Sequence, residues 1–274
     1  MNGLKVLFNF YLDASIHVAL SVISLAAITS VLLNIPVNLF LIGFIFFSTI
    51  VCYNFVKYGV EAEKYLIVSN VYHKNIQVFS FISFLLAIYF LANLDRKTWL
   101  VVAGLGLIST LYAIPFLPKA KNLRSLGGFK IYVVAVVWVG FTSFLPVLDF
   151  KMPLTYDLWV LFAQRFILVL ILILPFEIRD LQWDDKKLKT LPQVLGIQKT
   201  KMIGFVLIAL FCLLTFLRDE VAPLEIIMRL FLGSLLMAVF LLNNTFKTNY
   251  LVSFWIEGIP ILWFGIFYSL ETFF

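Results

Sequence analysis

Nine apolar runs, each close to the length of a membrane-spanning helix, dominate this sequence. They cover residues 16–34, 37–58, 76–94, 98–115, 129–148, 157–179, 201–217, 224–242 and 251–270. Crossing a bilayer as a helix takes about 20 apolar residues, with a range of about 17–25. Charged residues make up 13% of the chain, against roughly 25% in soluble domains. The sequence therefore predicts an all-α polytopic membrane bundle with about nine transmembrane helices, embedded in a lipid bilayer.

The breaks between these runs consist of residues that end helices or form turns, such as Asn34-Ile35-Pro36. No low-complexity segment or linker intervenes, so we predict a single transmembrane domain over residues 1–274. The net charge of +6 reflects lysines in loops, and we expect no nucleic-acid partner. The two cysteines, Cys52 and Cys212, lie far apart in apolar runs and have no metal-ligand spacing.

The loop charges predict an orientation across the membrane. With nine spans, four basic loop residues (Arg96, Lys97, Lys151 and Arg218) fall on one side, and the other loop lysines and arginines fall on the opposite side. Cytoplasmic loops carry the excess of Lys and Arg. We therefore predict that the N-terminus and the loops after the second, fourth and sixth helices are cytoplasmic, in the inner membrane of a bacterium.

The most polar stretch of the chain is residues 175–196, which read PFEIRDLQWDDKKLKTLPQVLG. Glu177, Asp180 and Asp184 are spaced i, i+3 and i+7, so they share one face of a helix. Such carboxylates repel one another unless a cation neutralises them, and Mg²⁺ prefers a few carboxylates together with substrate phosphate oxygens. Arg179 and Lys187 supply positive charge for a polyphosphate. The alternative is a solvated, charged loop that only sets the topology.

The same segment resembles a known motif. The pattern Glu177-Ile178-Arg179-Asp180-x-x-x-Asp184, followed by Thr190-Leu191-Pro192-x-x-Leu195-Gly196, is similar to the second aspartate motif of the UbiA-type intramembrane prenyltransferase superfamily. Two weaker patterns agree with it: Tyr112-Ala113-Ile114-Pro115 with Gly127-Gly128 further on, and Trp255-Ile256-Glu257-Gly258. With the helix count, the resemblance covers essentially the whole chain.

The resemblance implies a central cavity between the helices, open to the cytoplasmic side and to lipid. It implies transfer of an isoprenyl group from its diphosphate to a lipophilic acceptor, most commonly an aromatic quinone precursor, with Mg²⁺ as the cofactor. In this interpretation Asp180 and Asp184 hold the metal and Glu177 assists or orients it. The residues expected to neutralise the phosphates are Arg179, Lys119 and Lys187.

The chain departs from the family at the first aspartate motif, which reads approximately NDxxDxxxD. Here the corresponding residues, 53–65, read YNFVKYGVEAEKY. Asn54 is present, but Phe55, Tyr58 and Ala62 stand where the family has aspartates. One acidic wall of the expected metal site is therefore mostly missing.

A lysine accompanies this loss. Asn54, Lys57, Glu61 and Lys64 share one helical face, at i, i+3, i+7 and i+10. We hypothesise that Lys57, together with Asn54, contacts the diphosphate directly, because a lysine binds phosphate as a compact point charge. Alternatively, Lys57 pairs with Glu61 as an ordinary i, i+4 partner. On that alternative this wall has lost its metal chemistry. The weakened first motif also supports a second function, that of a degenerate family member that binds lipid or acts as a scaffold.

Charges inside the apolar runs require partners, because an isolated charge in a bilayer is costly. Glu225 lies four residues before Arg229, which predicts a structural ion pair. Arg165 is deeper, and we interpret it first as a residue that joins two helices. Glu257 is a candidate for a polar group that faces inward. Charges at depth also mark transport pathways, but here most polar residues gather at one membrane face, which disfavours a transporter.

Overall fold

Every regular element in the described part of the chain is a helix. The structure is a computed structural model, and it describes residues 3–59, 71–114, 127–184, 188–242, 246 and 250–273. The elements are, in chain order, α1 (Gly3–Asp13), α2 (Ile16–Leu32), α3 (Leu39–Asn54), η1 (Phe55–Gly59), α5 (Val71–Ala92), α6 (Arg96–Ala113), η3 (Gly127–Phe129), α7 (Lys130–Val139), η4 (Gly140–Phe144), α8 (Leu145–Asp149), α9 (Tyr156–Asp180), α10 (Leu191–Leu213), η6 (Leu214–Leu217), α11 (Pro223–Leu242), η7 (Leu251–Ile256) and α12 (Ile259–Phe273).

The predicted all-α polytopic bundle is confirmed, with a smaller number of clear membrane spans. Within the described residues, seven helical segments are long and apolar enough to cross a bilayer. The helices α1 and α2, bent by 54° relative to each other, make an eighth if the pair crosses as one span. Helix α6 matches a predicted run, but it is less apolar because it begins with Arg96 and Lys97. Length and composition thus support seven or eight spans, where the sequence predicted about nine.

Helix boundaries differ from the predicted runs mainly where polar residues extend a helix beyond the bilayer. α5 begins at Val71, and α10 begins at Leu191, ten residues before the predicted apolar run. The sequence analysis also did not predict α1, a short helix that meets α2 at a sharp bend. Ser15, at this bend, has a positive φ of 61°, a left-handed conformation that no helix interior adopts.

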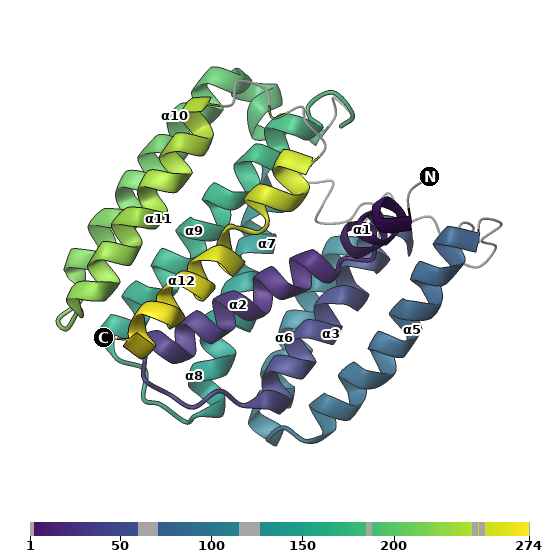
Figure 1. The fold of residues 1–274 in the computed structure, drawn as a ribbon, viewed down its shortest axis with the longest axis horizontal. Helices are drawn as coiled ribbons and strands as arrows, with labels where there is room; N and C mark the ends of the chain where they lie inside the picture. Colours follow the sequence, from purple (N-terminus) through teal and green to yellow (C-terminus); the bar gives the residue numbers. More distant parts are fainter. Residues whose placement is uncertain are drawn as a thin grey trace.

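The helices form one bundle in which segments far apart in sequence lie side by side (Figure 1). The antiparallel pair α10 and α11 occupies one edge, and α3 with α5 occupies the opposite edge. Between them α2 packs against both α3 and α12, and α9 packs against α7 and α10. The bundle therefore joins the first and last spans of the chain at its centre.

Helix α9 is the most enclosed element of the bundle. In its most apolar stretch 78% of the residues are buried, against 22% to 50% in the other spanning segments. Leu168, Ile171 and Leu174 belong to the main hydrophobic core together with residues of α10, α11 and α12. Because α9 ends in the acidic motif, the best-anchored helix of the fold fixes the start of that motif.

Three charged residues within the spans, Glu225, Arg229 and Arg165, have polar partners, as the sequence predicted. Glu225 and Arg229 form an i, i+4 ion pair on α11. Arg165 of α9 donates from Nη1 to the Leu25 carbonyl at 2.9 Å and from Nη2 to Thr29 Oγ1 at 3.0 Å, both on α2. These bonds satisfy groups that would be costly to leave unpaired in an apolar medium. The predicted interhelix role of Arg165 is confirmed.

Candidate functional site

A cavity of about 810 Å³ opens at the end of the bundle where α9 terminates. Its lining comes from α1, α3 and η1, α6, α7, α9 and η7, which converge in the upper part of Figure 1. Five of the residues predicted for the site line this cavity: Lys57, Glu177, Arg179, Asp180 and Asp184. The structure therefore brings together the altered first motif and the intact second motif.

The second motif follows α9 out of the membrane and turns back towards the cavity. Helix α9 ends at Asp180, and the backbone N–H groups of Trp183 and Asp184 both donate to the Asp180 carbonyl at 2.8 Å. This turn keeps Asp184 on the side of Glu177, as the i, i+7 spacing predicted. Glu177 is 5% exposed, so the acidic wall begins inside the protein.

The segment after the acidic wall begins α10 and steadies the turn. Gln193 Oε1 accepts from the Thr190 backbone N–H at 3.0 Å, one half of a capping box. Gln193 Nε2 also donates to the Asp184 carbonyl at 3.4 Å. Gly196 has a φ of 79°, a left-handed conformation that glycine adopts without a Cβ clash. The TLPxxLG pattern is therefore a helix start and kink that supports the acidic motif.

Lys130 connects the two ends of the acidic wall. Its Nζ lies 2.8 Å from Glu177 Oε1 and 3.0 Å from Asp184 Oδ2. Lys130 is the first residue of α7 and lines the cavity. From the sequence alone, Lys130 is one of the loop lysines predicted to be cytoplasmic. Its place two residues after Gly127-Gly128, at the start of an apolar run, was the signal that could have singled it out.

Arg179 holds the third carboxylate. Its Nε donates to Asp180 Oδ1 at 2.7 Å, and its Nη2 donates to Asp180 Oδ2 at 3.3 Å. Its Nη1 donates to Ser253 Oγ of η7 at 2.8 Å. Both side chains are about one quarter to one third exposed, so this pair lies where the cavity meets solvent.

The opposite wall is basic and aromatic where the family motif is acidic. A π-helical turn, η1, follows α3 and carries Lys57 and Tyr58 into the cavity lining; such turns often occur at functional sites. Lys57 Nζ donates to the Leu12 carbonyl at 3.3 Å, and the Tyr58 hydroxyl donates to the Asp13 carbonyl at 3.1 Å. Glu61, the alternative partner of Lys57, lies outside the described residues.

Three other predicted phosphate-site residues are placed differently or not at all. Asn54 is fully buried and is not part of the cavity lining. Its Nδ2 donates to the Ala14 carbonyl at 3.2 Å and to Ser80 Oγ at 2.9 Å, which ties α3 to the α1–α2 bend and to α5. These bonds give Asn54 a structural role, and its predicted contact with a diphosphate stays a prediction. Lys119 and Lys187 lie outside the described residues.

Glu257 reaches the cavity from the far end of the chain. It lies between η7 and α12 and lines the cavity. A Cβ added to the next residue, Gly258, would lie 2.6 Å from the Phe254 carbonyl and 3.2 Å from His17 Nε2. His17 Nε2 is itself 2.8 Å from the Phe254 carbonyl. The acidic-glycine pair thus combines a carboxylate in the cavity lining with a glycine that the Phe254 carbonyl approaches too closely for a Cβ.

The described lining of the cavity carries more acid than base. Its carboxylates are Asp13, Glu177, Asp180, Asp184 and Glu257, and its cations are Lys57, Lys130 and Arg179. With these groups ionised, the described lining is two charges negative. Glu177 Oε2 is buried and has no hydrogen-bond partner in the described protein. Both observations indicate that the cavity accommodates an additional cation.

The carboxylate oxygens and the surplus negative charge fit Mg²⁺, which takes hard oxygen ligands. Yet no group of three or more His, Cys, Asp or Glu residues in the described ranges converges as a ready metal site. The ion pairs explain this, because Lys130 holds Glu177 and Asp184 while Arg179 holds Asp180. The carboxylate oxygens are suitable ligands for Mg²⁺, and in this structure they are paired with Lys130 and Arg179.

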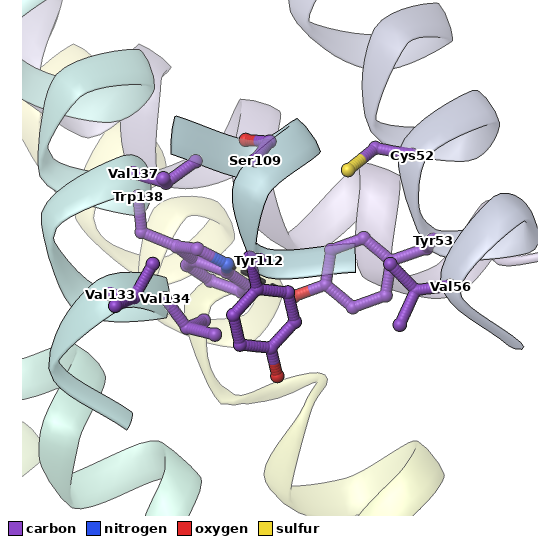
Figure 2. A pocket seen from close by; sticks show the side chains of 9 residues that line it. All are labelled: Cys52, Tyr53, Val56, Ser109, Tyr112, Val133, Val134, Val137 and Trp138. Carbon is purple, nitrogen blue, oxygen red and sulfur yellow. Dashed lines mark hydrogen bonds between the residues drawn. The ribbon is translucent and has the colours of Figure 1, made fainter. Parts of the chain in front are cut away.

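An apolar pocket of about 110 Å³ adjoins the polar cavity (Figure 2). Tyr53, Tyr112 and Val134 line both spaces. Figure 2 shows side chains from α3, α6 and α7 facing one another across this pocket. Trp138 Nε1 donates to the Tyr53 hydroxyl at 3.0 Å, which fixes one wall.

Two further apolar pockets, of about 170 and 380 Å³, continue from the first. Both are lined by Cys52 and Ser109, which also line the first pocket. The larger one extends between α3, α5 and α6, where Phe84 and Ile88 are exposed on the surface of the bundle. We call these three spaces the apolar chamber. A polar cavity that shares lining residues with an apolar chamber suits a ligand with a charged head and a hydrocarbon tail.

Fold and cavity together define a polytopic helical membrane protein with an amphiphilic site at one end of the bundle. Two solved structures of a UbiA homolog from Archaeoglobus fulgidus share this fold. The one bound to GPP and Mg²⁺ is 13% identical, with a TM-score of 0.60 over 96% of this chain and 99% of that chain. The one bound to DMAPP and Mg²⁺ is 13% identical, with a TM-score of 0.63 over 96% and 98%.

The present chain therefore has the UbiA-type fold that its motifs resemble. No protein-family model and no curated protein sequence matches it. At this identity the comparison establishes the fold, and the chemistry of the site has to be argued from the residues of this chain.

Proposed function

We propose that this protein transfers an isoprenyl group from an isoprenyl diphosphate to a lipophilic acceptor within the membrane. The observation that carries this proposal is the shared lining of the polar cavity and the apolar chamber by Tyr53, Tyr112 and Val134. A diphosphate in the cavity places its hydrocarbon tail in the chamber. The solved structures of this fold hold GPP or DMAPP with Mg²⁺, which supports the same ligand class.

The diphosphate is held from two walls of the cavity. Lys57 approaches from η1, while Lys130 and Arg179 approach from the acidic wall, so three cations surround the head group. Lysine and arginine both bind phosphate oxygens through charge-assisted hydrogen bonds. Mg²⁺ held by Glu177, Asp180 and Asp184 would neutralise the charge that the diphosphate acquires as it leaves.

The reaction breaks the ester bond between the isoprenyl carbon and the oxygen that joins it to the first phosphate of the diphosphate. Both electrons of that bond go to the oxygen, and an allylic, positively charged carbon remains at the boundary between cavity and chamber. Aromatic faces stabilise such a charge, and Tyr53, Tyr112 and Trp138 line this boundary. The carbon then bonds to the acceptor, whose displaced proton passes to a cavity carboxylate or to the released diphosphate.

The acceptor must be lipophilic because the chamber reaches the lipid-facing surface between α3, α5 and α6. We propose an aromatic acceptor resembling a quinone precursor, which can stack against the tyrosines at the boundary. The charge asymmetry of the loops supports a cytoplasmic cavity and a cytoplasmic N-terminus. We propose that the protein resides in the inner membrane of a bacterium.

The test is transfer by the purified protein in lipid nanodiscs. Radiolabelled GPP is supplied with Mg²⁺ and a panel of aromatic acceptors, and label in lipophilic product is measured. Asp184→Asn should lower transfer at least tenfold, because it removes a carboxylate from the cavity. The control is Asp149→Asn at the end of α8, where the new side chain can still accept the Asn38 hydrogen bond.

The assay also separates the alternative functions. Binding of GPP without transfer to any acceptor supports a degenerate member that binds lipid, an alternative favoured by the missing aspartates at Phe55 and Tyr58. Absence of GPP binding in both the presence and absence of Mg²⁺ refutes the proposed function.

A further inference from the structure

We propose that Lys130 is an exchangeable internal counter-ion, which occupies the acidic wall until a diphosphate arrives with its divalent cation. The proposal rests on the proposed function, since it concerns how the same cavity takes its charged ligand. It assigns to Lys130 a role in coupling metal binding to diphosphate binding. Its ammonium group neutralises the wall in the empty state and moves to the phosphate in the filled state.

The geometry places the ammonium between the two carboxylates. Lys130 Nζ is 2.8 Å from Glu177 Oε1 and 3.0 Å from Asp184 Oδ2. Both distances are those of charge-assisted hydrogen bonds. The side chains are 12%, 6% and 18% exposed, respectively, so solvent screens the three charges weakly. A divalent cation that uses these two carboxylates must first compete with the ammonium.

A second observation shows that Lys130 alone does not satisfy the wall. Glu177 is 5% exposed, and its Oε2 has no hydrogen-bond partner among the described residues although Glu177 lines the cavity. A buried acceptor without a partner is costly. One ammonium beside two carboxylates also leaves a net negative charge. The wall is therefore suited to a stronger cation than the one it holds.

Lysine is well suited to exchange. Its ammonium has three donors on a flexible stem and makes no geometric demands. In the described structure two donors face Glu177 and Asp184, which leaves one donor for a phosphate oxygen in the cavity. Lys130 is the first residue of α7, so its side chain can move without disturbing a helix interior.

This arrangement makes the binding of metal and diphosphate interdependent. Without diphosphate, a divalent cation has to displace Lys130 from two carboxylates and leave the ammonium unpaired. With diphosphate present, the ammonium gains a phosphate oxygen, and the carboxylates become available to the metal. Each ligand therefore raises the affinity for the other by the same factor.

The experiment measures Mn²⁺ binding by electron paramagnetic resonance, with the full-length protein in nanodiscs. Titrations are run with and without inorganic pyrophosphate, and the Mn²⁺–pyrophosphate mixture in buffer serves as the blank. The variants are Lys130→Met, which removes the ammonium, and Lys130→Arg, which keeps the charge on a stem that is less adaptable. The control is Lys151→Met, because Lys151 forms an exposed ion pair with Asp95 at 3.1 Å, away from the cavity.

We expect pyrophosphate to raise the Mn²⁺ affinity of the wild type at least tenfold. Without pyrophosphate, Lys130→Met should bind Mn²⁺ at least tenfold more tightly than the wild type. Lys130→Arg and Lys151→Met should bind Mn²⁺ as weakly as the wild type does. If Lys130→Met does not fold, the double variant Lys130→Met with Glu177→Gln removes the unpaired buried charge. In this double variant, pyrophosphate should raise the Mn²⁺ affinity less than threefold.

Equal Mn²⁺ affinity of Lys130→Met and wild type without pyrophosphate overturns the inference. Tight Mn²⁺ binding to the wild type without pyrophosphate overturns it as well. In either case the proposed function is tested separately by the wild type: it stands if GPP is bound and transferred, and it fails if GPP is not bound or is bound without transfer to any acceptor.

Discussion

Filling the apolar chamber should shorten the hydrocarbon tail that the protein accepts. Val137 of α7 lines both the 110 Å³ pocket and the 170 Å³ pocket behind it. In Val137→Trp the indole would occupy the space beyond Tyr53 and Tyr112, where a longer tail has to extend. The diphosphate contacts lie in the other cavity, so a short tail keeps its binding site.

The magnitude follows from the apolar surface that the tail buries. GPP is longer than DMAPP by one isoprene unit of about five carbons. At about 0.8 kcal/mol per buried carbon, full exclusion of that unit costs about 4 kcal/mol. Each 1.4 kcal/mol is a factor of about ten in affinity, so the loss is at most about a thousandfold. Since the indole leaves part of the chamber open, we expect a loss between tenfold and a thousandfold.

The assay is competition of unlabelled GPP or DMAPP against radiolabelled pyrophosphate, with the protein in nanodiscs. DMAPP affinity should stay within about threefold of wild type in Val137→Trp. The matched control is Val136→Trp, one residue away on α7, because Val136 is 45% exposed and does not line the chamber. Equal weakening of both ligands, or an unchanged GPP to DMAPP ratio, would refute the placement of the tail.

Three further substitutions test individual residues. Lys57→Ala should raise the KM for the isoprenyl diphosphate about tenfold through loss of one phosphate contact. If the rate of label transfer at a low concentration of isoprenyl diphosphate is unchanged, that contact is excluded. Asn54→Ala should lower the free energy of unfolding by about 1–3 kcal/mol, because the Ser80 hydroxyl and the Ala14 carbonyl lose a partner. The affinity for diphosphate should not change. A tenfold loss of that affinity would place Asn54 in the phosphate site. Gly258→Ala should destabilise by about 1–3 kcal/mol through the clash with the Phe254 carbonyl. A midpoint of thermal unfolding equal to that of the wild type would contradict the close approach of this carbonyl to the glycine.

Most of the fold was predictable because membrane helices have a strong length signal. The predicted run 157–179 became α9, Tyr156–Asp180, and the partners of Arg165 and Glu225 followed from the cost of unpaired charge in lipid. The helix α1 was not predictable in this way, because its eleven residues are too few to span a bilayer. The predicted run 98–115 corresponds to α6, Arg96–Ala113, whose apolar stretch is shortened by Arg96 and Lys97.

The site was predicted in part, and the reasons differ between its residues. Glu177, Asp180 and Asp184 share a helical face by spacing alone, so their common wall could be foreseen. Lys130 could not, since 47 residues separate it from Glu177 and only tertiary packing brings α7 against α9. The structural bonds of Asn54 to Ala14 and Ser80 could not be predicted from its motif position, because they depend on the packing of α3 against the α1–α2 bend and α5.

The altered first motif changes the charge balance of the cavity without abolishing the cavity. Phe55 and Tyr58 replace two acidic positions of the family pattern, and Lys57 adds a cation between them. The described wall formed by η1 therefore repels a diphosphate less than an acidic wall would. A diphosphate can bind beside it with fewer divalent cations. On the other wall Glu177 and Asp184 keep a demand for a cation that Lys130 meets only in part. Under the proposed function the two walls differ in kind: Lys57 would bind phosphate from one wall, and a cation that displaces Lys130 would bind it from the other.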